Sequence, residues 1–201
     1  MRLTTSFNPQ IPNSFSPDGR SLVLMEVVPK NGYDLNLLHV EGLRAGQPLT
    51  QPLVSTTFNE QGGEVSPDGH WLAYFSNESG QDEVYVRPFP KVDGGRWQIS
   101  TGGGTRPAWA RSGRELLYLT PTALMSVSVQ TTPTFSAGNP QKVFDGVFYA
   151  AVATRTYDVS ADGQRFLMIK NTASTGETAP PASMVVVEHW TEELKRLLPV
   201  K

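Results

Sequence analysis

The chain has 201 residues, no cysteine, and a formal net charge of −2 from 17 basic and 19 acidic residues. This length suffices for one domain with a sizeable core, and the charge balance gives no sign of a nucleic acid or an anionic membrane surface as partner. The lack of cysteine excludes disulfides and thiol chemistry, while 18 glycines and 16 prolines favour strands and turns. No apolar stretch approaches the length of a membrane span, so we expect no membrane insertion by this chain.

A short turn motif returns four times along the chain. The copies are Ser16–Gly19, Ser66–Gly69, Arg111–Gly113 and Ser160–Gly163, so the motif recurs every 44 to 50 residues. The residues that we expect to build these turns are Asp18, Gly19, Asp68, Gly69, Gly113, Asp162 and Gly163. In the third copy, Arg111 and Ser112 replace Pro-Asp, which leaves its turn type open. A period of this size is typical of repeat architectures.

Each turn lies between two expected strands, because Asp-Gly between apolar segments is a strong hairpin signal. The run after each turn is apolar on both faces, which indicates a strand covered on both sides. These runs are 22–25, 72–75, 116–119 and 166–169. Third strands are predicted at 35–38 and 84–86, and 97–99 closes the second unit. Three or four short strands per unit predict one blade of a β-propeller.

We therefore predict an all-β fold, a β-propeller of about four blades that are four-stranded antiparallel sheets. The blades run approximately over 6–54, 55–101, 102–145 and 146–190, and a short helix at 191–198 packs on the last blade as a cap. The strand-like segment 2–4 resembles the blade-ending strand of a preceding unit. It could close a four-blade ring, but a chain that starts inside the repeat favours an open or partial ring, the C-terminal part of a larger one. The exposed blade faces of such a part would favour self-association.

The inner strands supply the candidate binding residues, because inner strands line the channel of a propeller. Polar residues five to eight positions before the turn glycines have no obvious role in a core. They are Gln61, Glu64, Arg106, Arg155, Tyr157 and Asp158. The functional interpretation is a rim that contacts a protein, a peptide or a small ligand such as a glycan or an ion. The structural interpretation, which the residues favour, is a solvated funnel with internal ion pairs, such as Glu64 with Arg106.

No catalytic or metal-binding pattern is evident in the sequence. The three histidines, His39, His70 and His189, have no paired spacing, which argues against a zinc site. Gly-x-Ser-x-Gly and the catalytic loops of protein kinases are absent. Gly102–Gly104 could form an anion-binding nest, but its place between two blades favours a linking turn. We expect no cofactor, no metal and no enzymatic activity in this chain.

Several segments outside the turns share a pattern with a known family. Ser-Pro-Asp-Gly at 16–19 and 66–69, the segments 72–76 and 80–86, and Trp109 before the third turn resemble the WD40-like repeat of TolB-type propellers. The segments 124–129, 135–140, 157–168 and 190–197 are similar to the C-terminal propeller of certain bacterial serine/threonine protein kinases. The resemblance implies a sensor or scaffold module of a kinase-associated protein, whose kinase domain lies outside this chain.

Two other functions compete with this interpretation. A propeller that gates a prolyl-oligopeptidase-type serine peptidase would be followed by a hydrolase domain, whereas this sequence ends in the predicted helix. A sialidase-like propeller would need Ser-x-Asp-x-Gly-x-x-Trp repeats, and 66–71 lacks that spacing. The compartment stays open, extracytoplasmic for part of a membrane-anchored parent and cytoplasmic for a chain translated as given.

Overall fold

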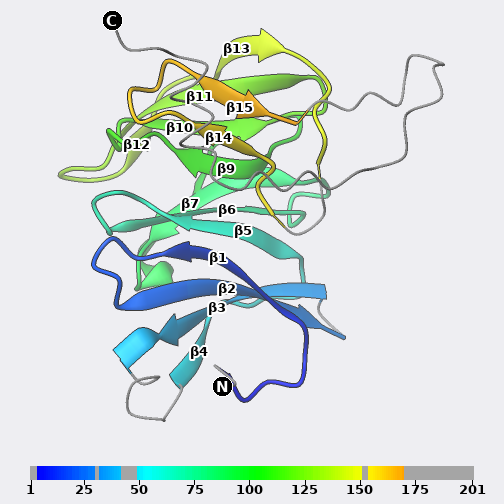
Figure 1. The fold of residues 1–201 in the computed structure, drawn as a ribbon, viewed down its shortest axis with the longest axis vertical. Helices are drawn as coiled ribbons and strands as arrows, with labels where there is room; N and C mark the ends of the chain where they lie inside the picture. Colours follow the sequence, from blue (N-terminus) through cyan, green and yellow to red (C-terminus); the bar gives the residue numbers. More distant parts are fainter. Residues whose placement is uncertain (1–3, 30–31, 42–48, 151–153, 170–201) are drawn as a thin grey trace, which may run out of the picture. The chain divides into compact units, whose positions relative to one another are not determined.

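A computed structural model describes residues 4–29, 32–41, 49–150 and 154–169 of the chain, and the structural statements below concern these ranges. They contain fifteen short strands, arranged in successive antiparallel sheets (Figure 1). The predicted helix at 191–198 and most of the predicted strand at 2–4 lie outside the described residues.

The first two sheets each contain four strands in chain order. The first is formed by β1 (Gln10–Phe15), β2 (Ser21–Val28), β3 (Gly32–His39) and β4 (Leu49–Val54). The second is formed by β5 (Glu60–Val65), β6 (Trp71–Ser76), β7 (Glu83–Pro88) and β8 (Trp97–Gln98), with the single 3-10 turn η1 (Val92–Gly94) before β8. Each is an antiparallel meander, the usual form of a propeller blade.

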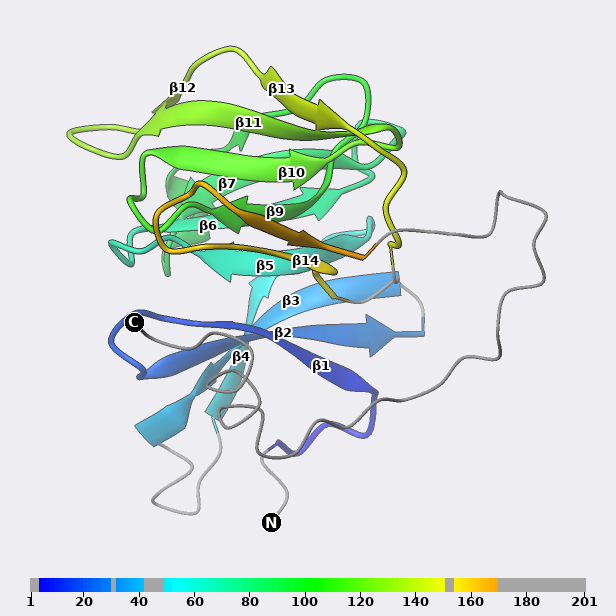
Figure 2. The ribbon, with the colours of Figure 1, turned by 45° about the horizontal axis from the view of Figure 1, so that its top comes forward.

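The third sheet follows the same order, and the fourth is described only as a hairpin. The third contains β9 (Thr105–Trp109), β10 (Glu115–Leu119), β11 (Ala123–Gln130) and β13 (Gln141–Asp145), and the short β12 (Ser136–Ala137) pairs with the far end of β11. The fourth consists of β14 (Tyr157–Val159) and β15 (Phe166–Met168). Figure 2 shows the first three sheets following one another in chain order, from the bottom of the view to the top. The prediction of an all-β propeller of four-stranded antiparallel sheets is confirmed.

The hydrophobic core is divided into layers between successive blades. On β6, Trp71, Ala73 and Phe75 pack toward the third blade, whereas Leu72 and Tyr74 pack toward the first. The second strand of the third blade, β10, alternates in the same way between its two neighbours. Successive residues of a strand point to opposite faces, so a strand covered on both faces must be apolar throughout. This explains the continuous apolar runs after the turns.

The repeated turns have one geometry in all four blades. The turn glycines Gly19, Gly69, Gly113 and Gly163 have φ between 68° and 75°, a conformation that other residues adopt only with strain. In the first turn the Asp18 carboxylate accepts hydrogen bonds from the Ser16 hydroxyl and the Arg20 N–H, at 2.6 and 3.0 Å. In the third turn the Ser112 hydroxyl accepts the hydrogen bond of the Arg114 N–H instead, at 3.3 Å. The turn left open by the sequence therefore has the same backbone conformation as the others.

No helix in the described ranges is long and apolar enough to cross a membrane. In the same ranges, no group of three or more His, Asp or Glu side chains is arranged to hold a metal ion.

Candidate binding site on the inner strands

The inner strands of the blades surround a hollow of about 260 Å³. Strands β1, β5 and β9 and the segment before β14 each contribute to its wall. The residues of the wall are Pro12, Asn13, Ser14, Gly62, Gly63, Glu64, Arg106, Pro107 and Arg155. Side chains of different blades therefore meet at one polar surface, as expected for the channel of a propeller.

Each of the three inner strands breaks its pairing register where it passes the hollow. The break lies at Asn13 in β1, at Gly62 and Gly63 in β5, and at Arg106 and Pro107 in β9. A bulge of this kind turns side chains away from the regular alternation of a strand and often lies beside a functional site. The backbone itself thus directs Glu64 and its neighbours at the channel.

Arg106 has a strained backbone at this bulge. Its φ is +54°, and Gly62, which stands at the same distance from its turn glycine, has φ +64°. A residue with a side chain pays an energetic cost in this conformation, and such strain concentrates at functional sites. The third blade therefore places an arginine where the second blade has the residue best suited to the backbone.

The central contact of the hollow is an ion pair between the second and fourth blades. One terminal nitrogen of the Arg155 guanidinium lies 2.9 and 3.0 Å from the two carboxylate oxygens of Glu64. The other lies 3.4 Å from the Asp158 carboxylate, which is exposed. The side chain of Glu64 is 22% exposed and that of Arg155 is 34% exposed, so both remain accessible from the hollow.

Burial shifts the acidity of two groups in this site. Desolvation raises the pKa of Glu64 to about 7, although the Arg155 charge and the hydrogen bonds from the Trp109 backbone and from Arg155 act in the opposite direction. Burial likewise raises the pKa of Tyr157, whose ring is 5% exposed, well above its ordinary value. Glu64 therefore changes its charge close to neutral pH, where a carboxylate is ordinarily ionised throughout.

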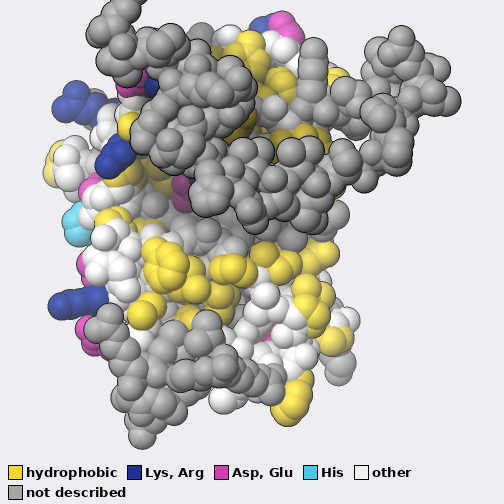
Figure 3. Space-filling model, in the orientation of Figure 1, with side chains coloured by type: hydrophobic (Ala, Val, Ile, Leu, Met, Phe, Trp, Pro, Cys, Tyr) yellow, Lys and Arg dark blue, Asp and Glu magenta, His cyan; other side chains and the backbone are white. Residues whose placement is uncertain are grey.

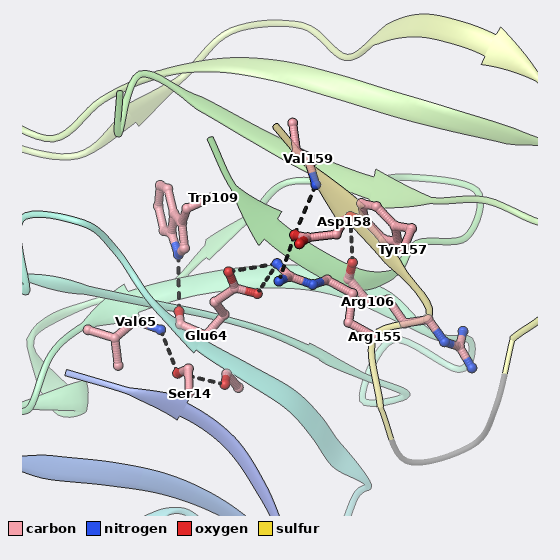
Figure 4. A network of polar contacts seen from close by, with 10 residues as sticks. Ser14, Glu64, Val65, Arg106, Trp109, Arg155, Tyr157, Asp158 and Val159 are labelled. Carbon is pink, nitrogen blue, oxygen red and sulfur yellow. Dashed lines mark hydrogen bonds and ion pairs between the residues drawn. The ribbon is translucent and has the colours of Figure 1, made fainter. Parts of the chain in front are cut away.

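Hydrogen bonds join the four inner strands around the ion pair (Figure 4). The Ser14 hydroxyl of β1 donates to the Gly63 carbonyl and accepts from the Val65 N–H of β5, at 3.1 and 3.0 Å. The Trp109 indole N–H of β9 donates to the Glu64 carbonyl at 3.0 Å. The Tyr157 hydroxyl of β14 donates to the Arg106 carbonyl at 2.9 Å. These bonds fix the positions of neighbouring blades.

The structure brings together some of the predicted site residues and separates others. Glu64, Arg155, Tyr157 and Asp158 form one contact group, while the Arg106 guanidinium points away from Glu64 (Figure 4). The ion pair suggested for Glu64 with Arg106 is thus made with Arg155, because Arg106 joins the group through its backbone carbonyl. Gln61 is buried, and it does not line the hollow.

Sequence reasoning missed the first blade's share of the site. Asn13 and Ser14 lie six and five positions before Gly19, respectively. The spacing from the turn glycine that identifies site residues in the other blades also identifies Asn13 and Ser14. Neither residue carries a charge that would mark it as a candidate. The sequence gives no sign that the Trp109 indole N–H takes part in the site, because a tryptophan at this position is already expected for packing in the core.

The glycine-rich segment between the second and third blades holds a carboxylate of the chain itself. The N–H groups of Gly102 and Gly103 donate to one oxygen of Glu83, at 2.7 and 2.9 Å. The Gln81 amide donates to the same oxygen at 2.6 Å, and the Ser100 hydroxyl donates to the other. We call Glu83 with these four donors the Glu83 clip. Together the donors outweigh desolvation and lower the pKa of Glu83. The segment is thus a linking turn, and the anion-binding nest formed by its N–H groups is occupied by the Glu83 carboxylate.

Comparison with known proteins places the fold. No protein-family model matches the chain, and no curated protein matches it. Among solved structures, the chain is similar to the structure described as a putative TolB from Agrobacterium tumefaciens, with a TM-score of 0.62, 18% identity, and coverage of 83% of this chain and 59% of that one. The chain is also similar to TolB from Acinetobacter baumannii, with a TM-score of 0.57, 14% identity, and coverage of 86% of this chain and 40% of that one. The chain therefore has a TolB-like β-propeller fold and spans less than two thirds of either TolB chain.

A propeller of a different class of protein also matches. A puromycin-hydrolyzing peptidase from Mycobacterium tuberculosis gives a TM-score of 0.54 at 17% identity, with coverage of 77% of this chain and 27% of that one. At such identities the similarity concerns the fold alone, since one fold supports many functions.

Proposed function

We propose that this chain is a non-catalytic β-propeller module that binds a peptide segment of a partner protein in the hollow of its inner strands. The observation that carries the proposal is the partly exposed ion pair of Glu64 and Arg155 in the wall of that hollow. A carboxylate and a guanidinium side by side offer an acceptor and several donors, which suits the polar groups of a peptide. The TolB-like fold supports a binding module but does not name its partner.

The proposal is tested by selection from a phage-displayed library of random peptides on the immobilised protein. We expect enriched peptides to bind the wild type and to lose at least about tenfold in affinity with Arg155→Ala, the loss of one charge-assisted contact. Arg114→Ala is the matched control, since Arg114 lies at the third turn and does not line the hollow. Peptides that bind the wild type and Arg155→Ala equally well would contradict the proposal.

The wider context that we propose is a sensor or scaffold part of a kinase-associated parent protein. The support is the resemblance of the C-terminal half of the sequence to the propellers of such kinases. Reading the coding region around this sequence tests it, because a kinase domain in the same reading frame would agree with the proposal. A hydrolase domain with a Gly-x-Ser-x-Gly motif would instead favour the peptidase alternative.

The peptidase alternative is supported by one observation, the match to the puromycin-hydrolyzing peptidase. If it holds, the propeller gates access to a catalytic domain encoded beside it, and the hollow admits substrate. Hydrolysis of a peptide substrate by the complete encoded protein, lost on replacement of the serine of its Gly-x-Ser-x-Gly motif, would establish this alternative.

A further inference from the structure

A second hollow, of about 470 Å³, lies between loops of the second and third blades. Its wall is formed by the loop before β7, the loop between β8 and β9, the loop between β10 and β11, and the segment after β13. The volume falls within the range of sites for small molecules. The peptide-binding hollow proposed above does not include these loops, although Arg106 contributes to both walls.

One carboxylate in this wall receives no hydrogen bond within the described part of the chain. This carboxylate belongs to Asp82, whereas its neighbour Glu83 accepts four hydrogen bonds in the Glu83 clip. Asp82 takes part in the fold through its backbone carbonyl, which accepts from the Gly104 N–H at 2.8 Å. A partly buried carboxylate has room for several donors, so the Asp82 side chain fits a donor group from outside the chain.

A positive charge also lies in this wall. Arg106 is the only basic side chain among the lining residues, which all belong to the described ranges, and its charge acts on Asp82. Burial lowers the pKa of Arg106 and raises that of Asp82, and the attraction between the two groups offsets part of each shift. The strained backbone of Arg106 holds this guanidinium on the side away from Glu64 (Figure 4).

Part of the remaining wall is apolar. It includes Leu119, which is buried, and Pro121 and Phe148. The Phe148 ring packs edge-on against Phe144 with its centroid 5.8 Å away, which fixes its position. A ligand in this hollow would therefore meet two opposite charges and an apolar surface.

We propose that this hollow binds a free α-amino acid with an apolar side chain. Its ammonium group is held by Asp82, its carboxylate by Arg106, and its side chain by Leu119 and Phe148. The two protein charges cancel, so a simple cation or anion is attracted by one group and repelled by the other. A zwitterion satisfies both groups at once, since each of its charges faces the opposite charge of the wall.

Titration calorimetry with L-phenylalanine tests the proposal on the full chain. We expect a dissociation constant at or below about 1 mM. N-acetylphenylalanine lacks the ammonium group and phenylalanine amide lacks the carboxylate, so each should bind at least about tenfold more weakly. Alanine keeps both charges and loses the ring, and it should also bind more weakly. The absence of binding by phenylalanine, or equal binding by its two blocked forms, would overturn the proposal.

Two variants assign the binding to this hollow. Asp82→Asn removes the negative charge, and Arg106→Gly removes the positive charge while matching the glycine at the same place in the second blade. Each should lower the affinity for phenylalanine at least about tenfold. Arg155→Ala, which alters only the peptide-binding hollow, should leave it unchanged, so the two proposals can fail separately. Unchanged affinity in a folded Arg106→Gly protein would overturn the assignment, even if Asp82→Asn does not fold.

Discussion

Two carboxylates of the second blade, Glu83 and Glu64, are buried to different extents and are stabilised in different ways. Glu83 is 1% exposed and is surrounded by four hydrogen-bond donors, and its pKa lies below the ordinary value. Glu64 has one guanidinium as its main side-chain partner, and its pKa is raised to about 7. A single ion pair thus compensates burial less completely than several short, fixed donors do.

This difference separates a structural group from an adjustable one. The Glu83 clip stays charged across the neutral range and fixes the loop between two blades. Glu64 gains or loses a proton near neutral pH at the wall of the proposed binding hollow. The second blade therefore holds a constant charge at one place and a changeable charge at the other.

The largest expected effect is the loss of the Glu83 clip. Glu83→Ala leaves the two glycine N–H groups and the Ser100 hydroxyl without their acceptor, and we expect the free energy of unfolding to fall by about 3 kcal/mol. Urea denaturation measures the change. Glu115→Ala is a suitable control, because within the described residues the Glu115 carboxylate accepts one side-chain hydrogen bond, from Ser126. If Glu83→Ala costs no more than this control, Glu83 does not hold the loop.

The second effect is a dependence of stability on pH. Because the folded state raises the pKa of Glu64 from 4.5 to about 7, the folded chain keeps a proton that the unfolded chain releases between these values. The stabilising contribution is complete below the ordinary pKa and is lost as the pH rises through about 7. We expect the free energy of unfolding to fall by about 2 kcal/mol from this group between about pH 5 and pH 8.

The Glu64→Gln variant isolates this contribution. Glu60, at the other end of β5, is also buried, and its desolvation raises its pKa to about 7, so part of the pH dependence should remain in Glu64→Gln. The double variant Glu60→Gln with Glu64→Gln should remove nearly all of it. Glu83 acts in another window, because its lowered pKa gives a contribution that is lost only as the pH falls below the ordinary value. A wild-type stability that rises toward pH 8 would contradict this prediction.

A smaller effect is expected for the hydrogen bond between the third and fourth blades. Tyr157→Phe removes the hydroxyl that donates to the Arg106 carbonyl and leaves the buried ring in place. We expect a loss of about 1 kcal/mol in chemical denaturation. Tyr149→Phe is the matched control, since Tyr149 is exposed and the same substitution there should change little. Equal effects of the two substitutions would show that the inter-blade bond adds no stability.

The smallest effect is expected in the third turn. Ser112→Asp restores the carboxylate that the other three turns use to accept the N–H two residues later. We expect a slight rise in the melting temperature, because a carboxylate accepts this hydrogen bond more strongly than a hydroxyl does. Ser112→Ala should lower it slightly. A lower melting temperature with Asp would mean that the turn tolerates the missing carboxylate for another reason.

The fold could be predicted from the sequence because its signals are local and repeated. The turn glycines need a conformation that favours glycine, and strands covered on both faces need continuous apolar runs such as 72–75. Both constraints act within a few residues, and they recur with each blade. The bulges in the inner strands could not be predicted, because Arg106 gives no sequence signal for a positive φ.

The candidate site was predictable only as a set of positions. Counting back from the turns identifies Glu64 and Arg155, but it does not show that they pair, because contact between the second and fourth blades depends on how the blades pack against one another. The same limit applies to Gly102 and Gly103, whose nest is filled by Glu83, about twenty residues earlier in the chain.

Figure 3 shows apolar side chains gathered over β1, and Phe15, the last residue of that strand, is 60% exposed. A single exposed aromatic ring is ordinary, but a contiguous apolar area on a sheet favours association. Self-association through a blade face thus stays a prediction, which light scattering over a range of protein concentrations can check.

The Glu83 clip joins residues that are at most 20 positions apart in the chain. Closing a loop of this length costs little entropy and needs no strand of the third blade. We therefore expect the exit of the second blade to be fastened as soon as Gly103 leaves the ribosome, before β9 has emerged from it. Each folded blade can then present its apolar face to the next blade, which packs against it as it folds.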